Sequence, residues 1–110
     1  MTVKEMVDRL GLEVLSGHTG LNREITGGYS SDLLSDVMGN CDAGRVWITL
    51  QTHKNVMAIA SLKDLAAVIL IKELKPEADM AVHSEEEEIP VLGTSLPAFE
   101  MAGKLFELLR

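Results

Sequence analysis

The chain has 110 residues, 46% hydrophobic and 25% charged, which is enough for one compact domain with a small core. Its formal net charge of −7 argues against binding to nucleic acid or to an anionic membrane, since both require a basic surface. A single cysteine excludes an internal disulfide framework, and no apolar stretch has the length of a membrane span or the form of a leader. These features predict a cytoplasmic protein with a single domain over residues 1–110.

The first elements are predicted to be short. An amphipathic helix is expected over residues 2–10, because Thr2 and Glu5 have the spacing of a capping box and the apolar residues share one face. The other elements predicted before residue 45 are extended segments at 12–15 and 24–29 and a helix at 33–38, capped by Ser31 or Asp32.

From residue 45 onward the pattern is regular, with three strand-then-helix units over residues 45–110. Their strands begin about 21 residues apart, which suits short connections. The predicted strands are residues 46–50, 67–71 and 89–92, and the predicted helices are residues 52–61, 76–84 and 97–109. Since right-handed crossovers make such strands parallel, we predict an α/β fold with three layers, α/β/α, and a largely parallel sheet. Residues 12–29 are expected to add one or two strands.

Polar residues follow the predicted strands, where ligands tend to bind in open parallel sheets. Two of these loops lead into helix N-termini, which favour anions. The candidate ligand-binding residues at this edge are Thr49, Thr52, His53, Lys54, Thr94 and Ser95. The alternative is that Thr52 and Thr94 or Ser95 only cap helices, with His53 and Lys54 solvated.

No motif of a known catalytic or metal centre is present. There is no phosphate-binding P-loop, and the three histidines lack the spacing of zinc ligands. Cys41 is interpreted as structural or incidental, and the four glutamates at 85–88 as a solvated loop. We expect no catalytic residue, no metal and no cofactor.

One segment is unlike ordinary core or turn sequence. It joins a fixed charge, a hydroxyl and two adjacent glycines, which allow positive φ and close approach of a ligand or another backbone. The signature residues, which are also the candidate interface residues, are Asn22, Arg23, Thr26, Gly27, Gly28 and Tyr29.

This segment resembles the motif for which the DRTGG domain family is named. Further similarity lies in residues 32–38, 46–49, 89–94 and 97–103, so the resemblance covers roughly residues 10–110. Asn22 stands where the family's Asp is expected. Residues 50–53 and 72–74 replace glycine-containing loops expected in relatives, which puts ligand binding at that edge in question.

The resemblance implies a fold like the N-terminal domain of HPr kinase/phosphorylase and the DRTGG region of CBS-containing pyrophosphatases. It also implies a regulatory or accessory role. We predict a non-catalytic module that forms a homodimer and senses a small nucleotide or phosphorylated ligand. One alternative is a protein–protein adaptor in a kinase or iron-hydrogenase-associated system. Another is a small-molecule enzyme acting at the carboxyl edge of the strands. HPr kinase activity is rejected, because the chain has no P-loop.

Overall fold

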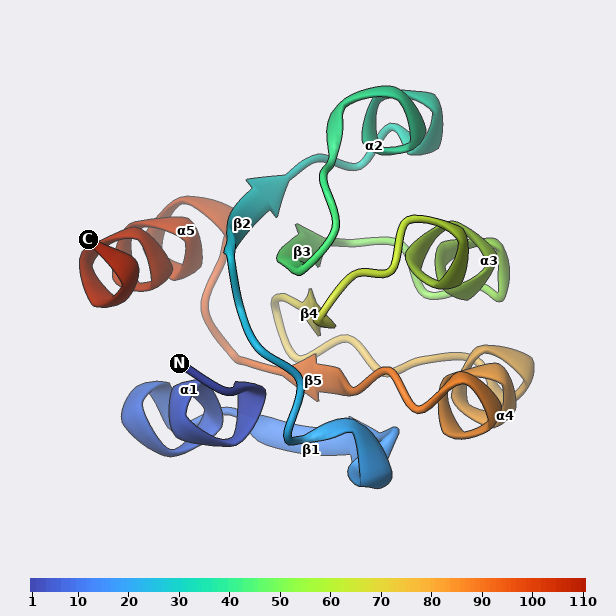
Figure 1. Cartoon of the computed structure of the whole chain (residues 1–110), viewed down its shortest axis with the longest axis horizontal. Coiled ribbons are helices and arrows are strands. Elements are labelled where there is room, and N and C mark those ends of the chain that lie inside the picture. Colours follow the sequence, from blue (N-terminus) through green and yellow to red (C-terminus); the bar gives the residue numbers. More distant parts are fainter.

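The computed structural model describes residues 1–110 as a five-stranded sheet between two layers of helices (Figure 1). The predicted three-layer α/β/α fold is therefore confirmed. The elements are α1 (Val3–Leu10), β1 (Glu13–Ser16), the 3-10 turn η1 (His18–Gly20), β2 (Gly27–Ser30), α2 (Leu34–Asn40), β3 (Arg45–Thr49), α3 (Asn55–Leu62), β4 (Ala67–Leu70), α4 (Ala78–Glu87), β5 (Val91–Gly93) and α5 (Ala98–Leu109).

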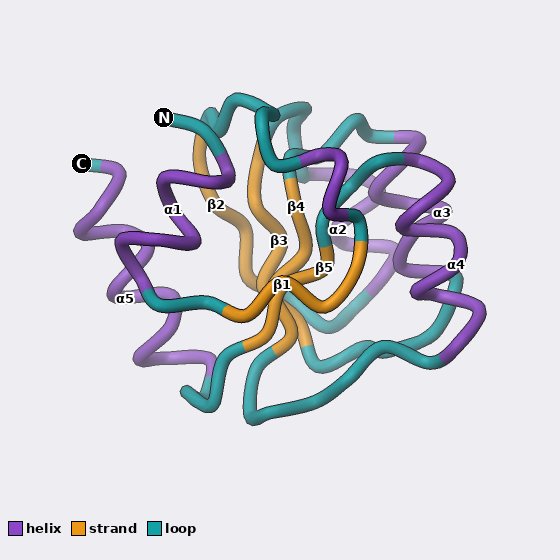
Figure 2. The backbone as a smooth tube through the Cα atoms, turned by 90° about the horizontal axis from the view of Figure 1, so that it is seen from below, coloured by secondary structure: helices purple, strands orange, loops and turns teal.

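The sheet has the strand order β1-β5-β4-β3-β2. Four strands, β2 to β5, are parallel, and β1 pairs antiparallel with β5. The three predicted strand–helix units thus supply the three central strands, and the N-terminal region adds the two edge strands. The carboxyl ends of the four parallel strands lie together at one end of the sheet, which we call the carboxyl edge (Figure 2).

Each face of the sheet has its own apolar core, because side chains alternate along a strand. In β3, Val46 and Ile48 face α1 and α5, whereas Trp47 faces α2, α3 and α4. All three side chains are at most 2% exposed. Burial on both faces explains why the middle of β3, residues 46–48, and all of β4 are apolar.

Some helix boundaries differ from the prediction. Helix α3 begins at Asn55, not at residue 52, because residues 51–54 form a loop in which His53 Nε2 lies 3.1 Å from Gln51 Oε1. Neither α3 nor α5 has a side-chain cap, so the alternative in which Thr52, Thr94 or Ser95 caps a helix is wrong.

The turn after β4 has a backbone that usually favours glycine. Lys72 has φ 57° and Glu73 has φ 61°, both in the left-handed region. The turn is held by N–H groups of Lys72 and Glu73, which donate to the carbonyls of Leu96 and Thr94 over 2.9 and 2.8 Å. Relatives are expected to have a glycine-rich loop here. In this chain Lys72 and Glu73 adopt the left-handed backbone angles that glycine would favour.

Candidate functional site

The carboxyl edge of the sheet is organised by Asp32. Its Oδ1 accepts hydrogen bonds from Thr49 Oγ1 at 2.9 Å and from the Leu50 N–H at 2.7 Å. The Gln51 side chain donates to the Asp32 carbonyl over 3.0 Å. Ser31 or Asp32 was expected to cap α2, but that helix has no side-chain cap, and Asp32 fixes the loop after β3 instead. The Ser31 hydroxyl accepts from the Leu33 N–H, before α2 begins.

The candidate residues Thr49, Thr52, His53 and Lys54 follow this loop. Thr49 is 1% exposed and its hydroxyl donates to Asp32, so its role is to stabilise the loop rather than to contact a ligand. Thr52 Oγ1 lies 3.3 Å from Glu77 Oε2, and Lys54 is exposed directly before α3. His53 and Lys54 are thus placed where a ligand could reach them.

Thr94 and Ser95 lie at the same edge but farther along the sheet. Thr94 Oγ1 accepts from the Leu96 N–H over 3.2 Å, and Ser95 is exposed. Because β4 separates β3 from β5, these residues are two strand spacings, or about 10 Å, from the end of β3. The six candidates therefore share one edge without forming one compact cluster.

The signature residue Arg23 has a structural partner for each part of its guanidinium group. Nε donates to the Glu88 carbonyl at 2.8 Å, Nη2 to the Glu87 carbonyl at 3.2 Å, and Nη1 to Asp64 Oδ1 at 3.1 Å. The last carbonyls of a helix have no partner within that helix and carry partial negative charge. Arg23 therefore satisfies the end of α4 and links it to the loop before β4.

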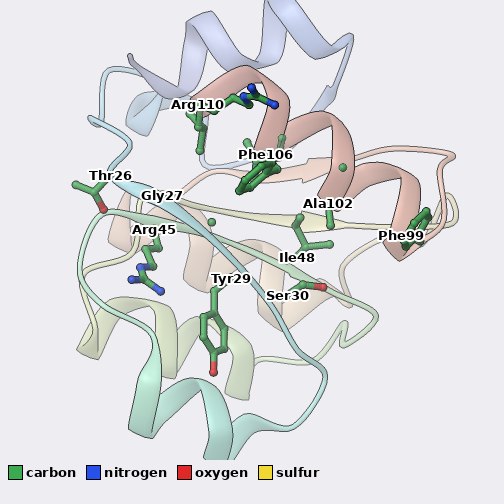
Figure 3. A pocket seen from close by; sticks show the side chains of 14 residues that line it. Thr26, Gly27, Tyr29, Ser30, Arg45, Ile48, Phe99, Ala102, Phe106 and Arg110 are labelled. Carbon is green, nitrogen blue, oxygen red and sulfur yellow. The ribbon is translucent and has the colours of Figure 1, made fainter.

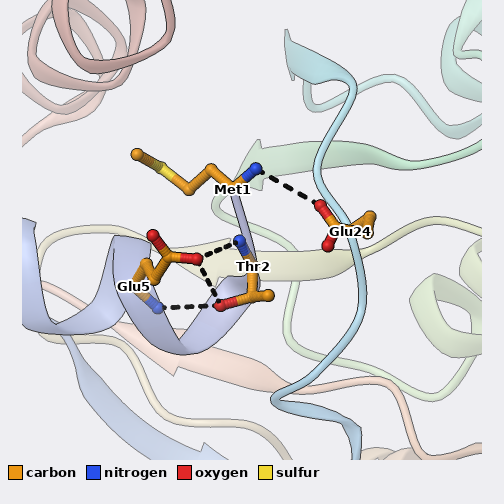
Figure 4. A network of polar contacts seen from close by, with 4 residues as sticks. All are labelled: Met1, Thr2, Glu5 and Glu24. Carbon is orange, nitrogen blue, oxygen red and sulfur yellow. Dashed lines mark hydrogen bonds and ion pairs between the residues drawn. The ribbon is translucent and has the colours of Figure 1, made fainter.

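The backbone around Arg23 also holds the start of α1. The N–H groups of Val3 and Lys4 donate to the carbonyls of Arg23 and Leu21, both over 2.9 Å. The Met1 ammonium group lies 3.2 Å from Glu24 Oε2, next to the predicted Thr2–Glu5 capping box, which is present (Figure 4). Asn22 is exposed in the turn.

The paired glycines lie in a strand, and neither has the positive φ that their sequence suggested. Gly28 permits close packing, because a Cβ there would lie 2.9 Å from Leu105 Cδ2 of α5. A Cβ at Gly27 would meet only Arg45, at 3.8 Å. The two glycines therefore have different roles. The lack of a side chain at Gly28 lets α5 pack closely on β2, whereas the space beside Gly27 is not filled by another element.

The remaining signature residues, Thr26 and Tyr29, make contacts inside the chain. Thr26 Oγ1 donates to the Ala43 carbonyl over 2.9 Å. The Tyr29 hydroxyl donates to Asp36 Oδ2 over 2.9 Å, which raises the pKa of Tyr29. The nearby hydroxyls of Ser31 and Tyr29 lower the pKa of Asp36.

A groove of about 690 Å³ lies between β2 and α5 (Figure 3). Phe99 and Phe106 of α5 line it and are 85% and 69% exposed. Arg45 and Arg110 line it as well. The sequence carried a signal for this wall of the groove: Phe99, Ala102 and Phe106 form a second apolar stripe beside the one that faces the core. The other residues of the lining come from β2, including Thr26, Gly27, Gly28 and Tyr29.

The glutamates at 85–88 do not form a solvated loop, as was expected. Three of them complete the last turn of α4, and Glu85 Oε1 accepts a hydrogen bond from the Gly17 N–H at 2.7 Å. His18 Nδ1 lies 3.4 Å from the same oxygen. The Gly17 hydrogen bond is the main cause that lowers the pKa of Glu85. The loop prediction failed because these tertiary contacts, together with Arg23, stabilise an acidic helix end.

No group of three or more His, Cys, Asp or Glu side chains is arranged to hold a metal ion. The Cys41 side chain is fully buried, and burial raises the pKa of its thiol. None of the helices is both long and apolar enough to cross a membrane.

Comparison with solved structures shows what this fold is similar to. The chain matches the CBS and DRTGG domains of the regulatory region of a Clostridium perfringens pyrophosphatase, in complex with the activator diadenosine tetraphosphate. The TM-score is 0.73 and the sequence identity 13%, over 94% of this chain and 45% of that chain. This chain therefore spans less than half of the length of the regulatory-region chain that it matches. The comparison shows a DRTGG-like fold, as the sequence resemblance implied.

No protein-family model and no curated protein sequence matches this chain.

Replacing the two glycines of β2 by alanine should have different effects on stability. Gly28→Ala is expected to lower the free energy of unfolding by about 1–3 kcal/mol, because the buried Leu105 side chain must move. Gly27→Ala should be neutral or slightly stabilising, since alanine costs less backbone entropy than glycine in a strand. Urea unfolding of both variants measures the difference, and equal effects would show that α5 does not pack against Gly28 as described.

Replacing Glu85 by glutamine should reduce the loss of stability in acid. The folded-state pKa of Glu85 is lowered, so its contribution to stability is complete above its ordinary pKa of 4.5 and is lost as the pH falls through the lowered value. Urea unfolding of the wild type and Glu85→Gln at pH 7 and at about pH 3 measures this change. Glu86→Gln is the control, because Glu86 is exposed on the same turn. An identical pH dependence in all three proteins would contradict the assignment.

Proposed function

We propose that the chain is a non-catalytic regulatory or accessory module that binds a small nucleotide or phosphorylated ligand and forms a homodimer. The observation that carries this proposal is the DRTGG-like fold, shared with the regulatory region of a pyrophosphatase that binds a nucleotide activator. Since a fold alone does not determine function, the site must supply further support.

The carboxyl edge supports an anionic ligand. The first N–H groups of α3 and α5 have no side-chain cap and point toward this edge. Lys54 is exposed in front of α3, and His53 is half-buried beside it. Thr94 and Ser95 stand in front of α5. We infer that a phosphate group binds by Lys54 and the start of α3, on a loop held in shape by Asp32 and Thr49.

Ligand binding can be tested by thermal unfolding with adenine and guanine nucleotides and with phosphorylated sugars. A ligand that binds only the folded chain stabilises it by about 1.4 kcal/mol at ten times its Kd, which raises Tm by several degrees. Lys54→Glu should abolish the shift, whereas Lys104→Glu, the same charge change in α5, should preserve it. Equal shifts in both variants would contradict the assigned place, and a lack of any shift would contradict the sensor.

The dimer has support from two exposed leucines. Leu33 and Leu50 are 64% and 40% exposed and flank Asp32, the residue that fixes this part of the edge. Exposed apolar side chains that lie together often mark an interface. Sedimentation equilibrium should give about twice the 12.0 kDa mass of the chain, and Leu33→Glu should return it to the monomer mass. A wild type of 12.0 kDa at high concentration would contradict the dimer.

The adaptor hypothesis has one observation in its favour. Asp79, Val82 and Glu86 form an exposed acidic and apolar strip on α4, in a chain with a net charge of −7. Such a surface suits a basic partner, whose binding would weaken with salt. An enzyme at the carboxyl edge stays a prediction, because Thr52, His53 and Thr94 are distributed over two loops with β4 between them.

A further inference from the structure

Strand β2 is an edge strand with one side unpaired. It pairs only with β3, and its sequence is Gly-Gly-Tyr-Ser. Natural edge strands commonly carry charged residues, proline or a bulge that block pairing with another strand. None of these devices is present in the four residues of β2. The free side of β2 is therefore chemically open to another extended chain.

The alternation of hydrogen bonds identifies the open groups. In a parallel ladder, every second residue directs its N–H and C=O toward a given neighbour. The Ser31 N–H, directly after β2, donates to the Ile48 carbonyl of β3 over 3.2 Å. In the register that pairs Ser30 with Ile48, Tyr29 and Gly27 therefore bond to β3. By contrast, Gly28 and Ser30 direct their backbone groups away from β3, into the groove. Gly28 has no side chain to obstruct them.

Helix α5 forms the opposite wall of the groove. Phe99 and Phe106 lie on one side of this helix, with the small Ala102 and Gly103 between them, and all four line the groove. Figure 3 shows the phenylalanines beside the strand, Phe99 toward the Ser30 end and Phe106 nearer the middle. Such a wall fits apolar side chains that project from one face of an extended chain.

The two ends of the groove differ in chemistry. Arg45 is paired in register with Gly27, and Arg110 lies at the end of α5, so both arginines lie toward the Thr26–Gly27 end (Figure 3). They are bound to Asp42 and Glu107, each at 3.2 Å. Such exposed pairs are weak, so the guanidinium groups can also accept a carboxylate. The other end, near Phe99 and Ser30, is apolar and neutral.

We propose that this groove binds an extended segment of a partner protein, which adds to β2 as an antiparallel sixth strand. Its backbone bonds to Gly28 and Ser30, alternate apolar side chains contact Phe99 and Phe106, and a carboxylate lies at Arg45 and Arg110. This assignment is separate from the proposed ligand site, because it uses the free side of β2 and helix α5, whereas the ligand site uses the loop after β3 and the start of α3.

A second copy of this chain fits the groove less well than a single strand. If β2 paired with its own copy about a two-fold axis, the partner's α5 would approach the same side as this α5. Both helices would then place Phe99 and Phe106 in the space beside the strands. A lone extended segment brings no such helix, and its carboxylate complements the two arginines.

The test uses a displayed library of random 12-residue peptides, selected against the whole chain. We expect enriched peptides with alternating apolar residues and an acidic residue or free carboxylate toward their C-terminal end. The best sequence is then synthesised with a fluorophore, and its Kd is measured by anisotropy. Amide exchange with and without the peptide reports on the backbone, where slower exchange at Gly28 and Ser30 is expected.

Two matched pairs of variants locate the binding. Ser30→Pro removes an outward N–H and Ser30→Ala keeps it. Phe106→Glu and Leu62→Glu place the same charge at side chains that are 69% and 71% exposed, on opposite faces of the sheet. The first member of each pair should weaken binding at least about 10-fold, and the second should change it less than about 2-fold. Circular dichroism checks that all four fold.

Three results would overturn the proposal. One is a selection that enriches no peptide, and another is a peptide that binds all four variants alike. The third is a dimer that Phe106→Glu converts to monomer, which would identify a second copy as the occupant. The nucleotide shift does not depend on any of these results, so the two proposals can fail separately.

Discussion

The contacts of the segment at residues 21–25 connect parts of the molecule that are far apart in sequence. Its carbonyls accept the first N–H groups of α1, on one face of the sheet. The guanidinium group of Arg23 binds the last carbonyls of α4, on the other face. One short loop thus satisfies the backbone at the ends of two helices in different layers, each of which would otherwise lose hydrogen bonds. The position of β2 follows from this anchoring, because the strand begins two residues later.

The adjacent glycines of β2 allow α5 to pack closely on the strand and leave its free edge accessible. On the α5 side, Gly28 allows Leu105 to contact the strand closely. At the free edge, Gly28 also leaves its outward N–H and C=O uncovered. A larger residue at Gly28 would change the groove by displacing α5, whereas a Cβ at Gly27 would meet only Arg45. The pair that marked the segment as unusual in sequence is thus explained by packing and access rather than by positive φ.

The features of the fold that depend on local sequence pattern could be predicted from the sequence alone. Apolar runs and regular spacing predicted the three strand–helix units, because buried parallel strands have few alternatives. Contacts between distant residues could not be predicted. Nothing near Asp32 indicates that it would bind Thr49 and Leu50, and nothing near Glu85 indicates Gly17 as its partner. The antiparallel direction of β1 and the groove wall of α5 also depend on which elements become neighbours in space.

Two candidate sites with different chemistry share β2. Its carboxyl end leads into Ser31, whose carbonyl accepts from Trp47 Nε1 at 2.8 Å, and then into Asp32, which fixes the proposed anion site. Its free edge forms the floor of the groove. Coupling between two sites requires an element whose equilibrium both ligands bias. An edge strand paired on one side, with two glycines, resists displacement less than the central strands, which are paired on both sides. A phosphate bound beside the Asp32 loop and a strand bound to Gly28 and Ser30 would therefore act on β2 and on the loop that directly follows it, and the proposed regulatory role would require such a shared element.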